Sequence, residues 1–265
     1  MKKNFLKKNK IGIFILSRYN SKRLKNKARL KILNKNLIEI LIERLIKKFN
    51  SKDITICSSN SNNNKNFYIK ISKKYRIGFF FGSEKNVLKR ILDCIKVKKL
   101  NHFVRVTGDN PLTDTNAIMK LAHSHLKNQN DYTYTQSLPI GMRPEIYSAK
   151  ALKKNYKYIE DLNSTEYLTY FFLRKDLYKV GKIPFKKKYK KQNLLSVSID
   201  TKSDYLKLKK MFEKYKDIFL DTDKILKYFA NKVKKTKSIL KIPLKTKKFN
   251  TRYNFDKKNS YLIYK

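Results

Sequence analysis

The sequence has little of what disulfide-rich, membrane-spanning or glycine-loop proteins need. Its 265 residues include two cysteines, five prolines, six glycines and no tryptophan. Cys57 and Cys94 are too few for a disulfide framework and have no metal-ligand spacing, so we expect two small core residues in a reducing compartment. No run approaches the roughly 20 apolar residues of a membrane span. We therefore expect a soluble, cytoplasmic protein with no membrane span.

Acidic residues are also scarce, with 20 Asp and Glu against 65 Lys and Arg and a formal net charge of +45. A polyanionic partner would explain this excess, and so would an AT-rich coding sequence that favours Lys, Asn, Ile, Tyr and Phe. The lysines are spread along the whole chain, and only ten of the 65 basic residues are arginines. Base and phosphate recognition relies more on arginine. We therefore expect no specific nucleic-acid partner.

The stretch from Ile11 to Lys27 joins a short apolar strand to a cationic loop. The run from Ile11 to Leu16 is too short for a core helix or for the roughly 7–15 apolar residues of a signal peptide, and it suits a buried parallel strand. The loop lacks the glycines of G-x-x-x-x-G-K-[ST] and G-x-G-x-x-G, so its side chains must hold any phosphate. Basic residues fill many loops of this chain, but open α/β sheets bind ligands after their strands. The candidate phosphate-binding residues are Arg18, Ser21, Lys22, Arg23, Lys25 and Lys27.

Strand and helix patterns alternate over the first half of the chain. After the first strand, helical spacing from Leu37 to Phe49 is followed by predicted strands at Asp53–Cys57, Ile77–Phe81 and His102–Val106, with helices at Asn66–Tyr75, Val87–Ile95 and Asp114–Leu126 between and after them. This alternation predicts an α/β fold with a doubly wound, mostly parallel sheet. Beyond it we expect a helix at Thr165–Arg174, extended stretches at Tyr178–Phe185 and Leu194–Ile199, and helices from Ser203 and Asp221.

Three parts of the chain differ in composition. Residues 1–10 form a basic arm that we expect to be mobile, and residues 11–230 form one α/β domain. Residues 231–265 are basic, poor in acids and weakly periodic. We expect this extension to pack loosely or to pair with another subunit, as in a homodimer.

Two aspartates stand where predicted strands end. Asp109 lies in TGDNP and Asp200 lies in SIDT. If both strands are central in one sheet, both carboxylates face the crevice that receives the basic loop. Oxygen ligands beside cationic phosphate binders suit a Mg²⁺–nucleotide site, because this ion takes one or two carboxylates plus phosphate oxygens. The alternative for each aspartate is a helix or turn cap, and it is the stronger alternative for Asp200.

Other polar residues give weaker signals. Glu145, in the loop GMRPEIYS, would meet a sugar hydroxyl or pair with one of many lysines. His123 and His125 are about 200° apart on a helix, so they cannot chelate one ion, and we expect both at the surface. His102 has no visible partner. Asp221-Thr222-Asp223 has D-x-D spacing, but a helix cap explains it better.

Taken together, the motifs resemble those of the cytidylyltransferase family that includes the spore coat polysaccharide biosynthesis protein F group, and more distantly the synthetases of CMP-activated acidic sugars. Residues 17–27, SRYNSKRLKNK, match A-R-M-x-S-x-R-L-P-G-K, with Lys25-Asn26 in place of Pro-Gly. Residues 82–90 match G-S-x-x-D-V-L-x-R, and residues 105–114, RVTGDNPLTD, match R-x-T-G-D-N-P-L-x-D. Glu166 and Thr169 fit R-E-H-x-T, with Ser164 and Tyr167 in place of Arg and His, and residues 199–201 fit V-D-T.

The resemblance implies a Rossmann-like nucleotide-diphospho-sugar transferase fold in three layers and a CTP-dependent activation of a sugar or sugar acid for surface polysaccharide or glycoconjugate synthesis. It implies Mg²⁺ as cofactor, and CTP and the sugar as partners. The implied catalytic residues are Arg18, Lys27 and Asp109, and the metal ligands are Asp109 and Asp200. The implied nucleotide-binding residues are Leu16, Ser17, Arg18, Ser21, Arg23, Lys27, Ser83 and Asp109, with Glu145 and Glu166 on the sugar side.

Two other functions remain open from the sequence. A glycosyltransferase of related GT-A fold would consume an activated donor, but it would need a D-x-D at a strand end near mid-chain, where only Gly108-Asp109-Asn110 stands. A non-enzymatic polyanion-binding protein is supported by charge alone. It predicts tight binding of DNA with a steep dependence on salt.

Overall fold

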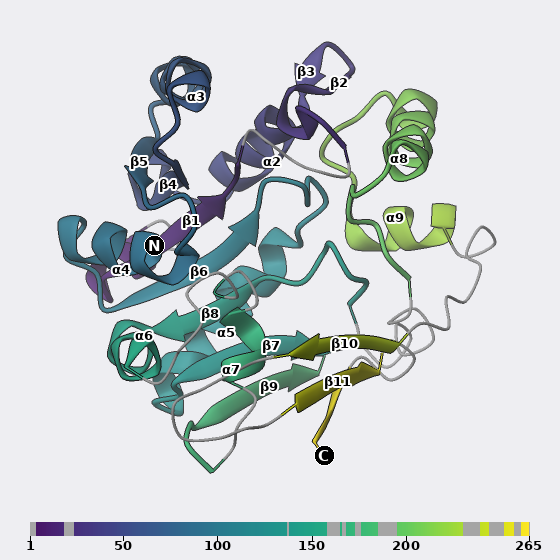
Figure 1. Ribbon diagram of the computed structural model, residues 1–265. Helices are drawn as coiled ribbons and strands as arrows, with labels where there is room; N and C mark the ends of the chain where they lie inside the picture. The colour runs from purple at the N-terminus through teal and green to yellow at the C-terminus, as the bar shows by residue number, and fades with distance from the viewer. Residues whose placement is uncertain are drawn as a thin grey trace.

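The computed structural model describes residues 4–18, 24–136, 138–157, 165, 168–172, 176–184, 195–229, 239–243, 252–256 and 261–264. At its centre is a seven-stranded sheet with the order β5-β4-β1-β6-β8-β7-β9 (Figure 1). Its strands are β1 (Ile11–Leu16), β4 (Ile54–Ser59), β5 (Gly78–Gly82), β6 (His102–Thr107), β7 (Tyr132–Gln136), β8 (Glu145–Ser148) and β9 (Val180–Pro184).

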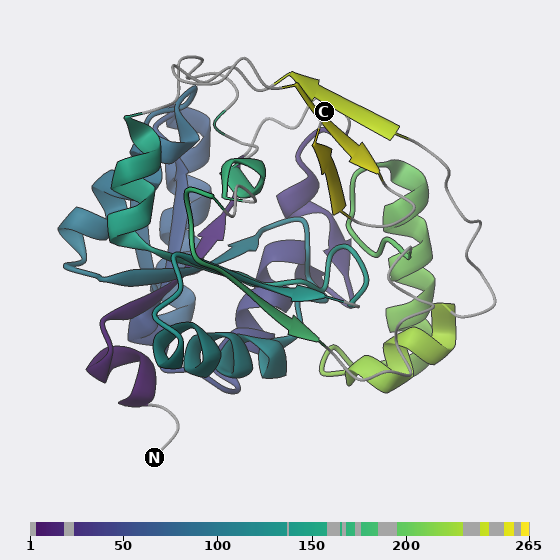
Figure 2. The same ribbon diagram turned by 90° about the horizontal axis from the view of Figure 1, so that it is seen from below.

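Helices cover both faces of this sheet (Figure 2). One face packs against α1 (Phe5–Lys8), α2 (Leu37–Ile46), α3 (Asn62–Tyr75) and α5 (Thr115–Lys127), and the other against α4 (Val87–Val97), α6 (Ala149–Tyr156) and α7 (Leu168–Phe171). Along β1, Ile13 and Ile15 face the first layer, and Phe14 and Leu16 face the second. Because both faces are covered, this strand is apolar throughout, as its sequence predicts. The expected three-layer, doubly wound sheet is confirmed.

One strand runs against the others. β5, β4, β1 and β6 are parallel neighbours, whereas β8 lies antiparallel between β6 and β7. β9 then pairs with β7 in parallel. The antiparallel β8 sets Arg105 of β6 opposite Glu145.

The segment after β9 forms a third apolar cluster at the side of the molecule that holds the carboxyl ends of the parallel strands (Figures 1 and 2). It contains α8 (Lys202–Tyr215) and α9 (Thr222–Phe229). α8 contacts β2 (Lys31–Ile32), which pairs with β3 (Lys35–Asn36). The expected strand at Leu194–Ile199 is wrong, because its described residues make one isolated bridge, between Ile140 and Ser196. The position beside β6 is already taken by β8, so this segment pairs with the 138–142 loop instead.

Several predicted boundaries also change. The expected mobile arm contains α1, whose Leu6 is buried against the sheet's helices. The strand predicted at Asp53–Cys57 extends to Ser59 as β4, and the helix predicted from Asn66 begins at Asn62 as α3. Of the helix expected at Thr165–Arg174, the structure describes α7. Thr165 has 3₁₀ conformation, and Arg174 lies outside the described residues.

The remaining elements are short or separate. Two 3₁₀ turns, η2 (Lys27–Arg29) and η3 (Ser51–Asp53), precede β2 and β4. In the predicted extension, β10 (Ile239–Pro243), β11 (Arg252–Asp256) and β12 (Tyr261–Tyr264) form an antiparallel sheet of their own. Among the described residues, every helix is too short or too polar to cross a bilayer.

Candidate functional site

The candidate site begins where the two central strands end. β1 and β6 are adjacent and parallel, so Ser17 and the Thr107–Asn110 turn leave the sheet side by side. The Gly108 backbone N–H donates to the Leu16 carbonyl at 2.8 Å. A Cβ on Gly108 would lie 2.6 Å from Ser17 Oγ, which explains why glycine stands here. This close approach fixes the position from which Asp109 projects.

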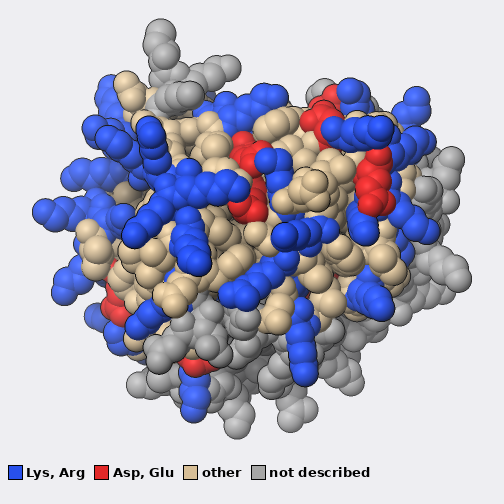
Figure 3. Space-filling view, turned by 90° about the horizontal axis from the view of Figure 1, so that it is seen from above, with Lys and Arg blue, Asp and Glu red and all other residues tan. Residues whose placement is uncertain are grey.

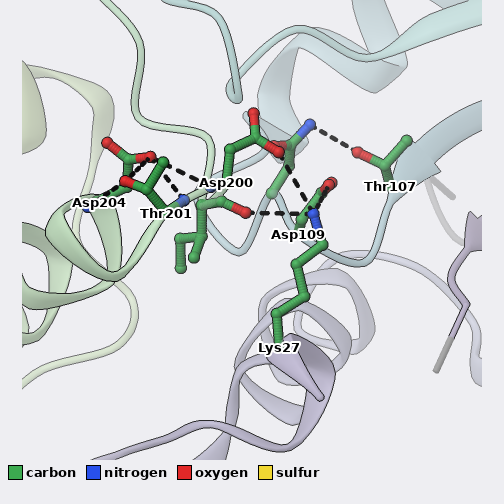
Figure 4. A network of polar contacts seen from close by, with 8 residues as sticks. Lys27, Thr107, Asp109, Asp200, Thr201 and Asp204 are labelled. Carbon is green, nitrogen blue, oxygen red and sulfur yellow. Dashed lines mark hydrogen bonds and ion pairs between the residues drawn. The ribbon is translucent and has the colours of Figure 1, made fainter. Parts of the chain in front are cut away.

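Lys27 joins the basic loop to both predicted metal ligands (Figure 4). Its Nζ lies 2.5 Å from Asp109 Oδ2 and 3.4 Å from Asp200 Oδ1, and it donates to the Ile199 carbonyl at 3.2 Å. The Lys27 side chain is only 14% exposed. Three segments that are distant in sequence therefore meet at one ammonium group.

The charge of Asp109 depends on this contact. Burial raises the pKa of its carboxyl, but the Lys27 ammonium and hydrogen bonds from Lys27 and Thr107 more than offset burial, so the pKa lies below its ordinary value. With 23% of its side chain exposed, Asp109 is ionised yet still accessible.

Asp200 reaches the site through a segment outside the sheet. The Ile199 N–H donates to the Asp109 backbone carbonyl at 3.1 Å, which docks this segment on the end of β6. The cap of α8 is Thr201, in a capping box with Asp204, rather than Asp200. The Asp200 side chain, 30% exposed, instead faces Lys27. The alternative of Asp200 as a cap is therefore wrong.

Asn26 shapes the loop that positions Lys27. It has φ 53° and ψ 28°, the left-handed conformation, and it precedes the 3₁₀ turn that starts at Lys27. Asparagine is among the few residues other than glycine that adopt this conformation readily. Asn26 thus fills the role of the glycine in the resembled motif P-G-K.

The donor set around Lys27 suits a hard divalent cation. Two carboxylate oxygens and one carbonyl oxygen converge on a single positive charge. Oxygen donors of this kind are those that Mg²⁺ prefers. Within the described ranges, no group of three or more His, Cys, Asp or Glu residues could hold a metal. A bound ion would therefore need further ligands from substrate or water.

The other predicted phosphate-binding residues are only partly described. Arg18 is exposed directly after β1, and Ser21 and Arg23 lie outside the described residues. Leu16 and Ser17 are largely buried, and Ser17 Oγ contacts the Tyr68 hydroxyl at 2.7 Å. Burial raises the pKa of Tyr68 to about 12, so its hydroxyl stays protonated.

Ser83 lies at the same edge, after the outermost strand β5. Its hydroxyl accepts a hydrogen bond from the Asn86 N–H at 3.1 Å, and its carbonyl accepts one from Arg90 Nη1 at 2.8 Å. Ser83 also has the position expected of a cap for α4, but Asn86 is the cap and its side chain accepts a hydrogen bond from the Lys89 N–H. Ser83 therefore stabilises the turn before α4, and the hydrogen bond from Arg90 to its carbonyl stabilises the same turn.

Glu145 is the centre of a second polar cluster, on the α7 face of the sheet. Its carboxylate accepts hydrogen bonds from Arg105 at 2.8 Å, from the Tyr132 and Tyr147 hydroxyls at 2.9 Å each, and from Thr169 at 2.9 Å. The alternative that Glu145 pairs with a lysine is wrong, since its cationic partner is Arg105. Glu166, which is expected with Glu145 on the sugar side, lies outside the described residues.

Sequence reasoning missed most of this cluster. Arg105 appears in a quoted motif, but nothing in the spacing places it opposite Glu145, because that pairing requires the antiparallel β8. Burial disfavours a charged Arg105, but Glu145 raises its pKa above the ordinary value. The R-E-H-x-T match was the one usable signal, because its Thr169 contacts Glu145 directly.

The histidines differ from expectation. His125, predicted at the surface, is completely buried. Its Nε2 lies 3.1 Å from Nδ1 of His102, which therefore does have a partner. His123 is exposed, as predicted.

Comparison with known structures shows that the protein shares its Rossmann-like fold with nucleotidyltransferases. A cytidylyltransferase from Leptospira borgpetersenii superposes with a TM-score of 0.76 at 24% identity, over 83% of this chain and 94% of that one. A CMP:2-keto-3-deoxy-manno-octonic acid synthetase complexed with CTP superposes with a TM-score of 0.59 at 10% identity, over 78% of this chain and 99% of that one. These likenesses establish the fold.

Sequence comparison identifies the family. The cytidylyltransferase family model matches residues 12–239, so the chain belongs to the cytidylyltransferase family and is a nucleotidyltransferase enzyme. An uncharacterized protein of Methanocaldococcus jannaschii is 36% identical over 77% of this chain and 84% of its own length. The spore coat polysaccharide biosynthesis protein SpsF of Bacillus subtilis is 28% identical over 78% of this chain and 88% of its own. The resemblance stated from the motifs is confirmed.

Proposed function

We propose that this enzyme transfers CMP from CTP to a sugar or sugar acid and releases pyrophosphate, in the synthesis of a surface polysaccharide or glycoconjugate. The observation that carries the proposal is the Lys27 ammonium in contact with both Asp109 and Asp200, at the carboxyl edge of a parallel sheet. The CTP complex of a structural neighbour and the printed name of SpsF support the nucleotide and the pathway class.

In this mechanism the basic loop holds the triphosphate. Arg18 and Lys27, with Ser21 and Arg23, donate to the β- and γ-phosphate oxygens and neutralise charge as pyrophosphate leaves. A hydroxyl of the acceptor attacks the α-phosphorus in line and releases its proton to water, forming a new P–O bond while the bond to the α,β-bridging oxygen breaks. Positioning and charge stabilisation supply most of the acceleration.

Asp109 and Asp200 are the residues that would hold Mg²⁺. When bound, this ion would polarise the α-phosphate and offset its growing negative charge. In the free enzyme Lys27 holds the two carboxylates together. When nucleotide binds, the Lys27 ammonium exchanges its carboxylate partners for phosphate oxygens.

The acceptor side would lie near Glu145 and Glu166. Arg105, Tyr132, Tyr147 and Thr169 fix the Glu145 carboxylate in one orientation. A carboxylate held in this way accepts hydrogen bonds from sugar hydroxyls without reorganising, which favours one acceptor geometry.

The test is pyrophosphate release from nucleoside triphosphates with Mg²⁺ and a panel of sugars and sugar acids. We expect release with CTP and one class of acceptor, with a CMP-linked product detected by mass spectrometry. Asp109→Asn should lower kcat by about 100-fold or more, because a charge at the reacting phosphate is lost. Asp93→Asn, which removes a surface carboxylate paired with Lys89, is the matched control and should keep kcat. Full turnover by Asp109→Asn would refute the site.

A further inference from the structure

A large cavity lies at the end of the sheet opposite the candidate site. Its volume is about 1020 Å³, and its walls come from the start of β6, the end of α5 and the first turns of α6, toward the left of the sheet in Figure 1. His102 opens β6 and lines the cavity, and Thr107 closes the same strand beside the candidate site. Five residue steps along a strand separate the two places by roughly 17 Å. The cavity is therefore distinct from the proposed CTP site.

The wall that α6 contributes is cationic. Lys150, Lys153, Lys154 and Lys157 line the cavity at positions i, i+3, i+4 and i+7, which form one face of a helix. Lys154 Nζ donates to the Leu177 carbonyl at 3.0 Å, whereas the other three make no ion pair with any described residue. Asp131 is the single acid among the described lining residues. This wall attracts anions.

A buried chain of hydrogen bonds ends at the cavity. Asn130 Nδ2 lies 3.0 Å from Thr133 Oγ1, which lies 3.0 Å from Nδ1 of His125. Nε2 of His125 lies 3.1 Å from Nδ1 of His102. Thr133 and His125 are completely buried, so each hydrogen in the chain needs an acceptor within it.

The chemistry of these groups fixes the direction of the chain. The Asn130 amide nitrogen only donates, so the Thr133 hydroxyl receives that bond and gives its own hydrogen to His125 Nδ1. His125 then carries its hydrogen on Nε2 and donates to His102 Nδ1. A neutral His102 must therefore carry its hydrogen on Nε2, the ring nitrogen without a hydrogen bond to the described residues. Burial lowers the pKa of both rings, that of His125 to about 3, which keeps both neutral at pH 7.

We propose that this cavity is a second ligand site, which binds the phosphate group of a phosphorylated organic molecule through the Nε2–H of His102 and the ammonium groups of Lys150 and Lys153. The cavity offers donors and positive charge with one acid, and phosphate oxygens accept several charge-assisted hydrogen bonds at once. Pockets for small organic ligands have volumes of roughly 300–1,000 Å³. The space thus accommodates an organic group attached to the phosphate.

Histidine-selective ¹⁵N–¹H NMR tests this site, because the chain has only three histidines. At pH 7 we expect the free protein to show His102 protonated on Nε2. Titration with glucose 1-phosphate at constant ionic strength should shift the His102 signals to saturation. Inorganic phosphate should do so only at higher concentration. The exposed His123, whose ring contacts that of Phe5 at a tilt, is an internal reference and should not follow the same curve.

Two double variants, each of which removes two lysine charges, provide the test and its control. Lys150→Gln with Lys153→Gln should weaken the His102 titration by about 10-fold or more. Lys207→Gln with Lys210→Gln, exposed on α8, should leave it unchanged, as should Asp109→Asn in the other site. A His102 ring protonated on Nδ1, an unmoved His102 signal, or equal weakening by both lysine pairs would overturn the proposal. Equal affinity for both ligands would overturn its organic part and leave a site for free phosphate.

Discussion

Among single residues, Asp109 has a charge that both stabilises the fold and serves the proposed chemistry. Its lowered pKa means that the ionised form is favoured in the folded state. Such a group stabilises the protein above the unfolded pKa of about 3.9 and loses this effect as pH falls through the folded pKa. We expect the Tm difference between the wild-type protein and Asp109→Asn to be constant from about pH 7 to 5 and to shrink below about pH 4.

Thermal denaturation followed by circular dichroism over this pH range measures that difference. Asp93→Asn is the control, since its partner Lys89 lies at the surface. A difference that persists unchanged to pH 3 would contradict the stabilising role of Lys27.

A second residue prediction concerns Glu145. Glu145→Gln keeps the size of the side chain but removes the charge opposite Arg105, which leaves a largely buried guanidinium without its anion. Breaking a buried pair costs about 3–5 kcal/mol, and because Gln still accepts hydrogen bonds we expect a loss of about 2–3 kcal/mol. Urea denaturation measures it. Glu213→Gln, in an exposed pair with Lys209, should lose under about 0.5 kcal/mol. Equal losses would show that the Glu145 cluster is not stabilising.

For single residues, the sequence was informative where a recognisable motif contains the residue. The sequence predicts that Lys27, Asp109 and Asp200 converge, because the motifs place each of them at an end of a segment. It cannot predict that Tyr132, Tyr147 and Arg105 share one carboxylate. Those contacts depend on which strands become neighbours, and strand order is not encoded in local spacing.

Among the elements, the turn after β6 has the strictest geometry. Gly108→Ala would place a Cβ 2.6 Å from Ser17 Oγ and 2.8 Å from Ser17 Cβ. The turn or β1 must then move, so we expect a loss of about 1–3 kcal/mol in the free energy of unfolding and a large fall in kcat as Asp109 shifts. Both effects are measured on purified protein by urea denaturation and pyrophosphate release.

A second substitution makes this prediction specific. Ser17→Gly removes both atoms that the new methyl group would meet, so Gly108→Ala with Ser17→Gly should recover part of the activity lost by Gly108→Ala. Should the double variant be no better than the single one, the contact with Ser17 is not the cause.

Whether a segment forms a helix or a strand was more predictable than which other elements it packs against. β1 and β4 are buried along their whole length, and their apolar sequences predict strands that are covered on both faces. The expected strand at Leu194–Ile199 is also rich in apolar residues, but its described side chains Leu195, Val197 and Ile199 pack with α8 and α9 rather than in the sheet. An apolar run shows that a segment is buried, and only the fold shows against what. His125 illustrates the reverse case, since a polar residue is buried through bonds to His102 and Thr133.

For the whole molecule, the question is whether a charge of +45 reflects a polyanionic partner. Figure 3 shows Lys and Arg distributed over the visible face, with acidic residues among them rather than one basic stripe. We expect duplex DNA to bind only at low salt and to dissociate between about 50 and 200 mM salt, since dispersed charges give non-specific binding. Fluorescence anisotropy with two unrelated duplexes measures this. Tight binding of one sequence at 150 mM salt would contradict the prediction.

The proposed cation site combines residues from two separate parts of the fold. Asp109 lies in the turn that follows β6, whereas Asp200 lies in a segment that is held by packing against α8 and α9, by one β-bridge and by the hydrogen bond from Ile199 to Asp109. A ligand that binds both carboxylates would therefore stabilise the contact between the segment that carries Asp200 and the turn that carries Asp109. Nucleotide binding would thus slow amide hydrogen exchange over residues 195–200, although these residues are far along the chain from the loop proposed to bind the phosphates. The stability of this contact would in turn affect the affinity for the triphosphate.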